Sequence, residues 1–431
     1  MYRTFVTVIL ILSAWTSCIA AGGAGAASAG GTDTVSLTLP GAEQRFLKNN
    51  LALIAQRYQI SQAQAGIITA RLFNNPDFSI ANVLYNPVTK KYFDMSRDGG
   101  EYSAQLSQLF LTAGKRNKNI ELAKITAQQA YFQFYDLLRT LRFTLRSDYY
   151  KLYFQRRSVM LYQQEINSLT TILAVFKEQF AKGNIAQKEV LRIQSQLYAL
   201  QAEQNELRAE IDDTESEFKL LVRMPPAEIV KLESAPEGKT NLTEVPYQRL
   251  LDSAMANRND LKLARSVVDY SNINLKLQKA MAVPDITASL AYDKQGSYVR
   301  NYNSAGIAFS LPFFNRNQGA IEQARIAVEA GKTQLQSQQD QLESDLANGY
   351  KGALRLADLY QSFDPGFRND FEHLIGEVAK NFQKHNITLL EFLDFYDSYK
   401  TNSLQLNALQ LERITSLEQL NFITGTQIFN Q

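Results

Sequence analysis

An internal duplication is the feature that most constrains the fold of this 431-residue chain. The stretch "FAKGNIAQKEVLRI" starts at Phe180 and "FQKHNITLLEFLDF" starts at Phe382, with Phe, Lys, Asn, Ile, Glu and Leu at matching positions. Three earlier landmarks recur in the same order: "NNLALIAQ" with "RNDLKLAR", "NPDFSI" with "VPDITA", and "LTAGKRN" with "LPFFNRN". Such repetition predicts two copies of one structural unit. We place them at residues 35–223 and 244–431, joined by a linker with Pro and Gly turn signals over residues 224–243.

Each copy is predicted to run helix, two strands, long helix, turn and helix, so the fold is mainly α with a small β part. In the first copy, neither Gly nor Pro occurs between Lys115 and Lys182, and apolar residues recur there at alternating steps of 3 and 4. This heptad pattern predicts a coiled-coil helix about 100 Å long, and only Asp148 and Gln155 break its apolar seam. In the second copy, Pro365 is expected to kink or interrupt the corresponding helix.

The strands are predicted at about residues 77–85, 101–111, 285–293 and 303–313, where apolar and polar residues alternate. Alternation over about ten residues is typical of a membrane-barrel strand, and it also describes an ordinary half-buried strand. Four strands are too few to close a barrel, and an open four-stranded sheet leaves exposed edges. Strands pooled from identical subunits would remove those edges.

The N-terminal segment has the layout of a secretory signal, with Arg3 before an apolar run and small residues after it. We expect a signal peptide over residues 1–20 and a flexible tether, "AGGAGAASAGGTDT", over residues 21–34. The segment "AWTSC" resembles a bacterial lipobox, which would make Cys18, the only cysteine, a lipidation site. The alternative is ordinary cleavage near "CIA", which discards that cysteine. Both interpretations place the mature chain outside the cytoplasm.

Composition and motifs exclude several classes of function. The formal net charge of +2 provides no broad basic field for nucleic acid. The two histidines, His373 and His385, lie twelve positions apart without a metal-ligand pattern. The chain also lacks a Gly-rich phosphate loop and a nucleophile elbow. We therefore expect no enzymatic activity, no cofactor and no metal site.

The duplication, the Pro-Asp strand starts at Pro76 and Pro284, and the two helical turns together resemble the TolC-type outer-membrane efflux proteins. The segment "LSQLFLTAGKR", from Leu106 to Arg116, looks most like the heavy-metal cation-efflux branch of that family. The resemblance implies a homotrimer in the bacterial outer membrane, with a 12-stranded β-barrel continued by a long α-helical coiled-coil barrel through the periplasm. It also implies docking onto a periplasmic adaptor fed by an inner-membrane pump of the RND type.

An acidic pair follows the second turn. Glu391 is followed at i+3 by Asp394, whereas Glu189 in the first copy is followed at i+3 by Arg192, which is placed to pair with it. An exposed acidic first turn favoured by the helix dipole is the alternative explanation for Glu391. The resemblance places Glu391 and Asp394 on the family's two acidic aperture positions, so a trimer would carry six carboxylates around a gate. Such a ring favours cations and could bind a multivalent cation that blocks the pore.

The two turns themselves match the family's tips that engage the adaptor, and they comprise Lys182, Gly183, Asn184, Ile185, Lys384, His385, Asn386 and Ile387. Gly183 and Asn184 suit a tight connection with positive φ. Ile185 and Ile387 are expected to expose apolar surface at the end of a polar rod. The alternative is that a helical hairpin simply needs a turn here.

The function implied is a passive exit duct of a tripartite efflux system, for small toxic compounds or metal cations. The same duct could serve type I protein secretion. From another class, a periplasmic coiled-coil scaffold without a pore is a further alternative, and it would be extractable without detergent.

Overall fold

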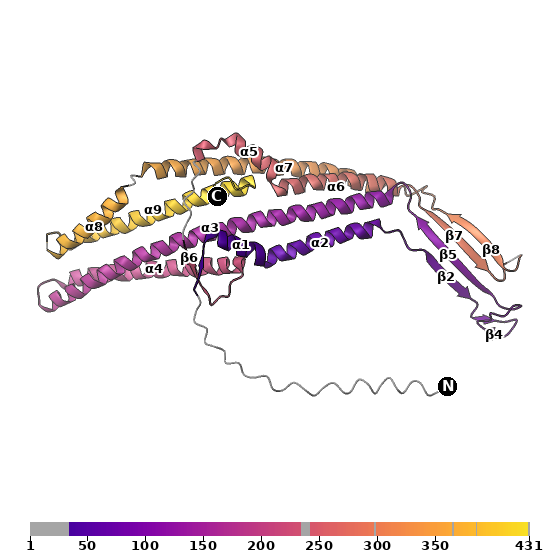
Figure 1. The fold of residues 1–431 in the computed structure, drawn as a ribbon, viewed down its shortest axis with the longest axis horizontal. Helices are drawn as coiled ribbons and strands as arrows, with labels where there is room; N and C mark the ends of the chain where they lie inside the picture. Colours follow the sequence, from indigo (N-terminus) through magenta and orange to yellow (C-terminus); the bar gives the residue numbers. More distant parts are fainter. Residues whose placement is uncertain (1–33, 234–241, 297–298, 364–365, 385, 430–431) are drawn as a thin grey trace, which may run out of the picture.

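The computed structural model describes residues 34–233, 242–296, 299–363, 366–384 and 386–429. The molecule is elongated, with its helices along the long axis, a β-sheet at one end and the turns of two helical hairpins at the other (Figure 1). The predicted signal peptide, most of the predicted tether and Cys18 lie outside the described residues.

The two copies share one order of elements, except that α7 and α8 of the second copy together correspond to α3 of the first. The first comprises α1 (Leu39–Asn49), α2 (Leu51–Arg71), β2 (Asp77–Asn82), β5 (Tyr102–Phe110), α3 (Lys115–Ala181) and α4 (Gln187–Val222). The second comprises α5 (Tyr247–Asn257), α6 (Asn259–Met281), β7 (Ile286–Asp293), β8 (Tyr302–Ala308), α7 (Gln318–Ser362), α8 (Phe367–Gln383) and α9 (Leu389–Thr424). The predicted fold class, mainly helical and duplicated with a small sheet, is confirmed.

The sheet joins the two copies, because its order is β2-β5-β7-β8 and the two central strands come from different copies. All three pairings are antiparallel, and Leu106 of β5 lies opposite Leu290 of β7. The predicted strand at 303–313 is too long, since β8 ends at Ala308. Ala308 pairs with Thr287, the second residue of β7, so the chain beyond it has almost no partner strand left.

Two further strand pairs were not predicted. The first strand was predicted to end at about residue 85, but β2 ends at Asn82. The chain then forms a short hairpin of β3 (Tyr85–Asn86) and β4 (Lys91–Tyr92). In the middle of the molecule, β1 (Thr34–Leu37) pairs in parallel with β6 (Ile229–Leu232). The predicted linker at 224–243 therefore contains a strand and the start of a 3-10 helix, η1 (Leu242–Glu244). Burial of Val230 in the core holds β6 in place.

The long helix of the first copy is continuous. Helix α3 has 67 residues, which corresponds to about 100 Å, and it packs against α2, α4, α6 and α9. Leu145 and Leu152 of the predicted seam are fully buried. In the second copy the helix is interrupted, because α7 ends at Ser362 and α8 begins at Phe367; Pro365 itself lies outside the described residues.

Helices of each copy meet end to end halfway along the molecule. Asn50, which caps the start of α2, accepts from the Leu53 N–H at 3.1 Å and donates to the Leu221 carbonyl of α4 at 3.0 Å. At the equivalent junction, Gly425 at the end of α9 lies against Arg258 before α6. In the part of the chain that the structure describes, no helix has both the length and the apolar character needed to cross a bilayer.

Candidate gate and helical tips

The turn between α3 and α4 closes as the sequence predicted. Gly183 has φ 77°, and its N–H donates to the Phe180 carbonyl at 2.9 Å. The Asn184 N–H reaches the Gln179 carbonyl at 2.9 Å, and the Asn184 side chain donates to the Gln179 side chain at 2.6 Å. These bonds satisfy carbonyls that the end of α3 leaves free, which is the usual role of a left-handed glycine there.

The turn between α8 and α9 repeats this pattern. The Asn386 N–H donates to the Asn381 carbonyl at 2.9 Å, and the two asparagine side chains are 3.2 Å apart. Lys384 ends α8, and His385 lies outside the described residues. Both turns are at the same end of the molecule (Figure 1), so the structure brings the predicted tip residues of the two copies to one region.

The two hairpins share one hydrophobic core near the turns. We call it the tip cluster, and its buried members are Ile166, Leu169, Leu173, Val190, Ile193, Leu197, Leu200, Val378, Phe382 and Phe392. Phe382 of α8 stacks on Phe176 of α3 at 5.6 Å and on Phe392 of α9 at 4.4 Å between ring centroids. Three helices from two copies are therefore held together by one aromatic stack.

One prediction about the tips is wrong. Ile185 and Ile387 do not project apolar surface from the rod, because both are half-buried and pack against the tip cluster. The cluster extends up to the turns, so a β-branched residue just after each turn completes the core. Exposed apolar surface near the tips comes instead from Leu191 and Leu390, which are 55% and 57% exposed.

Glu391 has a structural role that the sequence reasoning missed. Thr388 is the N-cap of α9, and its hydroxyl accepts from the Glu391 N–H at 3.2 Å. In return, one Glu391 carboxylate oxygen accepts from the Thr388 N–H at 2.7 Å and from its hydroxyl at 2.8 Å. These hydrogen bonds from the Thr388 backbone and side chain hold the pKa of Glu391 below its usual value. The signal was present as Thr-x-x-Glu ahead of an apolar run, which is a capping box.

The acidic pair faces solvent in the described chain. Glu391 and Asp394 are exposed, whereas Phe392 between them is fully buried in the tip cluster. The geometry therefore directs both carboxylates away from the core, on one side of the first two turns of α9. In the first copy, Arg192 is exposed and forms no ion pair with Glu189, although both residues are described. The predicted neutralising contact is absent from the structure.

Above the tip cluster, a buried charge joins α9 to the first copy. The Lys400 ammonium is 3.2 Å from Glu203 of α4 and 3.2 Å from Asp397 of α9. Burial lowers the pKa of Lys400, but the contacts with Glu203 and Asp397 outweigh it and raise the pKa overall. Nearby, burial raises the pKa of Glu165 on α3 to about 8. The start of α9 is thus fixed by apolar packing and by charge.

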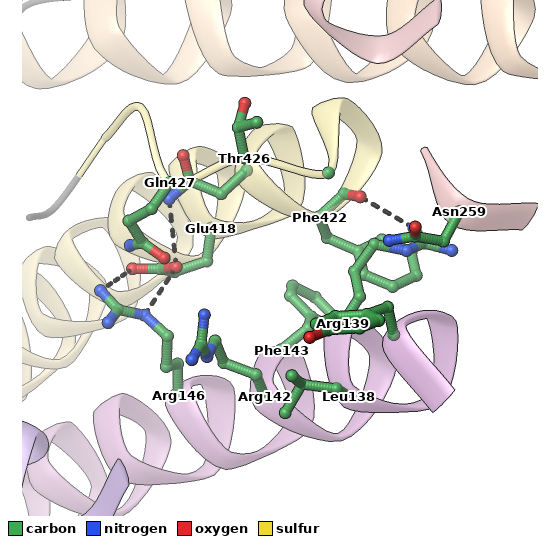
Figure 2. Close-up of a pocket in the computed structure, with 13 residues that line it drawn as sticks. Leu138, Arg139, Arg142, Phe143, Arg146, Asn259, Glu418, Phe422, Thr426 and Gln427 are labelled. Atoms are coloured by element: carbon green, nitrogen blue, oxygen red, sulfur yellow. Dashed lines mark hydrogen bonds and ion pairs between the residues drawn. The ribbon is translucent and has the colours of Figure 1, made fainter. Parts of the chain in front are cut away.

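The far end of α9 is held by arginines of α3 around a cavity of about 130 Å³ (Figure 2). Arg146 makes two hydrogen bonds to Glu418, at 2.8 and 2.7 Å, and a third to Glu43 of α1 at 2.7 Å. Arg139 donates to the Phe422 carbonyl at 2.8 Å and lies over the Phe422 ring. Arg139 thus provides a hydrogen-bond donor for a backbone carbonyl in the last turn of α9, and Arg146 joins α1, α3 and α9.

Among the described residues, no group of three or more His, Cys, Asp or Glu side chains is arranged to hold a metal ion. Each chain contributes two carboxyl groups to the candidate gate, those of Glu391 and Asp394.

The sequence profile of the outer membrane efflux protein family matches residues 42–222 and 250–426. The chain belongs to this family. The two matched segments coincide with the two structural copies, and membership confirms the predicted resemblance. This chain is therefore an outer-membrane efflux protein and not an enzyme.

Individual relatives are distant. The cobalt-zinc-cadmium resistance protein CzcC of Cupriavidus metallidurans is 23% identical over 296 residues, which is 67% of this chain and 66% of that protein. The chain thus aligns with just under two thirds of the length of this curated relative. The Campylobacter jejuni CmeC outer membrane channel superimposes with a TM-score of 0.72 at 13% identity, covering 90% of this chain and 85% of that chain. A membrane protein from Pseudomonas aeruginosa gives 0.73 at 15% identity, covering 90% and 93%. These likenesses confirm the fold.

Proposed function

We propose that the chain is the outer-membrane exit duct of a tripartite efflux system and conducts small toxic compounds or metal cations passively. The observation that carries this proposal is the placement of the elements in a chain of this family. A four-stranded sheet lies at one end of α3, a helix about 100 Å long, and the duplicated hairpin turns lie at the other end (Figure 1). Such a rod has the length of a periplasmic conduit and places its tips far from its sheet.

The sheet supports a trimer as the working form. Its edge strands, β2 and β8, pair on one side only within the described chain, and an unpaired edge invites association with another strand. Phe78, Ile80 and Ile307 on these strands are 65%, 68% and 73% exposed, as lipid-facing residues of a barrel would be. Three chains would supply twelve strands and remove all edges.

The tips support docking onto a periplasmic adaptor that an inner-membrane pump of the RND type feeds. A trimer would present six turns, three with the Lys182–Ile185 sequence and three with the Lys384–Ile387 sequence. Because Ile185 and Ile387 pack inward, the adaptor would contact polar turn atoms and the exposed Leu191 and Leu390.

We assign the gate to Glu391 and Asp394. Threefold symmetry would place six carboxylates around the narrow end of the tunnel, where they would attract cations and exclude anions. The capping box holds Glu391 in one position at the start of α9, so its charge would be fixed in space rather than averaged over rotamers.

Single-channel recording in lipid bilayers tests the gate with the double variant Glu391→Gln and Asp394→Asn. Glutamine can also complete a capping box, so the helix start is retained while the charge is removed. We expect loss of cation selectivity and block by hexaamminecobalt(III) that is weaker by about tenfold. Glu189→Gln in the first copy is the matched control and should leave both properties unchanged. Unchanged selectivity and block in the double variant would remove the gate assignment.

The kind of passenger is tested by growth of a deletion strain. The name of CzcC concerns cobalt, zinc and cadmium, and its similarity to this chain favours metal cations. Sensitivity of the deletion strain to these metals alone would support the export of metal cations. Sensitivity to dyes and detergents would indicate that the duct exports organic compounds. Loss of a secreted protein, with unchanged tolerance to all of these, would instead support type I secretion.

A further inference from the structure

Asp148 is the most unusual residue of α3. It occupies a position of the apolar seam, yet it is a carboxyl group that is only 8% exposed. Its Oδ2 atom has no hydrogen-bond partner in the part of the chain that is described. Burial and the nearby charge of Glu217 on α4 raise its pKa to about 7, although Lys151 opposes the shift. A buried carboxylate oxygen without a hydrogen-bond partner is costly, so the position of Asp148 calls for an explanation.

A cavity of about 570 Å³ lies beside this carboxyl group. It lies among three helices and therefore between the two copies. Asp148 and Ser147 of α3 line it together with Leu356 of α7 and with Leu411, Thr415 and Gln419 of α9. Its volume lies in the range of sites that bind drug-sized molecules.

The cavity is separate from the arginine contacts of Figure 2. On a helix, positions two apart point in directions about 200° apart, so Asp148 faces away from Arg146 and its partners Glu418 and Glu43. Of the residues that the structure describes, no arginine lines the cavity. Asp148 therefore takes no part in the ion pairs of Arg146 that hold α9 to α3.

The remaining charges at the cavity leave it net acidic. Lys151 lies one turn from Asp148 and is exposed, but the two form no ion pair. Exposed Glu412 of α9 also lines the cavity and offsets the lysine charge. A small divalent metal needs several oxygen ligands, and the buried part of this cavity supplies one carboxylate. A single buried acid beside leucine side chains instead suits one positive charge on an apolar body.

We propose that the cavity between α3, α7 and α9 binds amphipathic monovalent organic cations, with Asp148 as the counter-ion and Leu356 and Leu411 as the apolar contacts. The ligand bridges the two copies at mid-helix, far from both the tips and the sheet. This inference does not depend on the chain being an exit duct.

The test uses tetraphenylphosphonium as probe and tetraphenylborate, its near-isosteric anion, as the matched control. Binding to the detergent-purified full chain is measured by equilibrium dialysis, with protein-free micelles subtracted. We expect tetraphenylphosphonium to bind about tenfold more tightly at pH 8 than at pH 6, because Asp148 is mostly ionised only at the higher pH. Tetraphenylborate should show no such gain.

Three variants separate the contributions. Asp148→Asn keeps the shape and should weaken tetraphenylphosphonium binding at pH 8 by about tenfold and abolish its pH dependence. Thr415→Phe places a larger apolar side chain in the cavity and leaves Asp148 unchanged, so it should weaken binding by a similar factor at both pH values. Glu412→Gln changes only the exposed acid and should alter affinity less than about threefold. Equal affinity of the wild type and Asp148→Asn at pH 8, or an equal pH response of tetraphenylborate, would overturn the proposal.

Discussion

Thr388 and Ala186 occupy equivalent positions, immediately before the second helix of each hairpin, but only one of them caps its helix. Both have extended backbone conformations, with φ −78° and ψ 161° at Thr388 and φ −80° and ψ 146° at Ala186. Each is followed at the third helical position by a glutamate, Glu391 or Glu189. The first copy therefore has half of a capping box and lacks only the hydroxyl.

This pair gives a prediction at the scale of single residues. Thr388→Ala should lower the free energy of unfolding by about 1 kcal/mol, because the first turn of α9 loses its cap. Ala186→Thr should raise it by about 0.5–1 kcal/mol, because Glu189 is already placed to complete the box. Chemical denaturation of the detergent-solubilised protein measures both. A destabilised Ala186→Thr protein would show that the backbone before α4 does not accept the cap.

Residue-level prediction from the sequence succeeded where one residue decides the local geometry. Gly183 was predicted to need positive φ and has it, since a left-handed residue closes the helix end with local bonds alone. The exposure of Ile185 and Ile387 was predicted wrongly, because it depends on how far the core of the other hairpin extends. The extent of that shared core cannot be predicted from the sequence of one hairpin alone.

Elements from the two copies meet in the stack of Phe176, Phe382 and Phe392. Phe382 is buried at its centre, whereas Phe180, the equivalent residue of the first copy, is 43% exposed. Phe382 therefore provides the aromatic contact between α8 and α3, beside the buried Val378 of the tip cluster. The equivalent side chain of α3 makes no comparable stack among the described residues.

Phe382→Ala should release the α8–α9 hairpin from α3. Removal of a buried phenylalanine costs about 3–5 kcal/mol, and the loss should be concentrated in these two helices. Hydrogen exchange followed by mass spectrometry should show faster exchange in α8 and in the first half of α9, with α3 unchanged. Phe180→Ala, at the equivalent position, is the control and should leave exchange of α8 and α9 as in the wild type. Uniform acceleration throughout the chain would contradict a local role.

Element type was predictable because the strong patterns are long. The heptad of α3 extends over many turns, and its interruption in the second copy was expected from Pro365. Strands β1 and β6 have four residues each, and most of the sequence of the first copy lies between them. Segments so short and so far apart give no local pattern from which the pairing could be predicted. The strand at 303–313 was overextended because alternation continues past Ala308 after the partner strand has ended.

At the scale of the whole molecule, Arg146 joins three parts of the chain that are distant in sequence: α1 through Glu43, α3 itself, and α9 through Glu418. Arg146 and Glu418 are 6% and 2% exposed, so this is a buried ion pair with its hydrogen bonds made. Such a pair contributes little over an apolar replacement, but loss of one partner leaves the other charge uncompensated.

Arg146→Met should therefore destabilise the whole chain by about 3–5 kcal/mol, because the buried Glu418 carboxylate would lose the compensating charge of Arg146. Lys182→Met removes the exposed ion pair with Glu178 at the tip and should change stability by less than about 1 kcal/mol. Thermal unfolding in detergent, followed by circular dichroism, compares the two. If Arg146→Met unfolds no earlier than Lys182→Met, the joint between the copies is not held by this arginine.

The difference between the continuous α3 and the separate α7 and α8 has a mechanical consequence. An unbroken helix of 67 residues resists bending, whereas α7 and α8 are two separate helices that do not share one continuous axis. In a ring of three such chains, continuous and divided helices would alternate around the wall. The length of the tunnel would then follow from the continuous helix of the first copy.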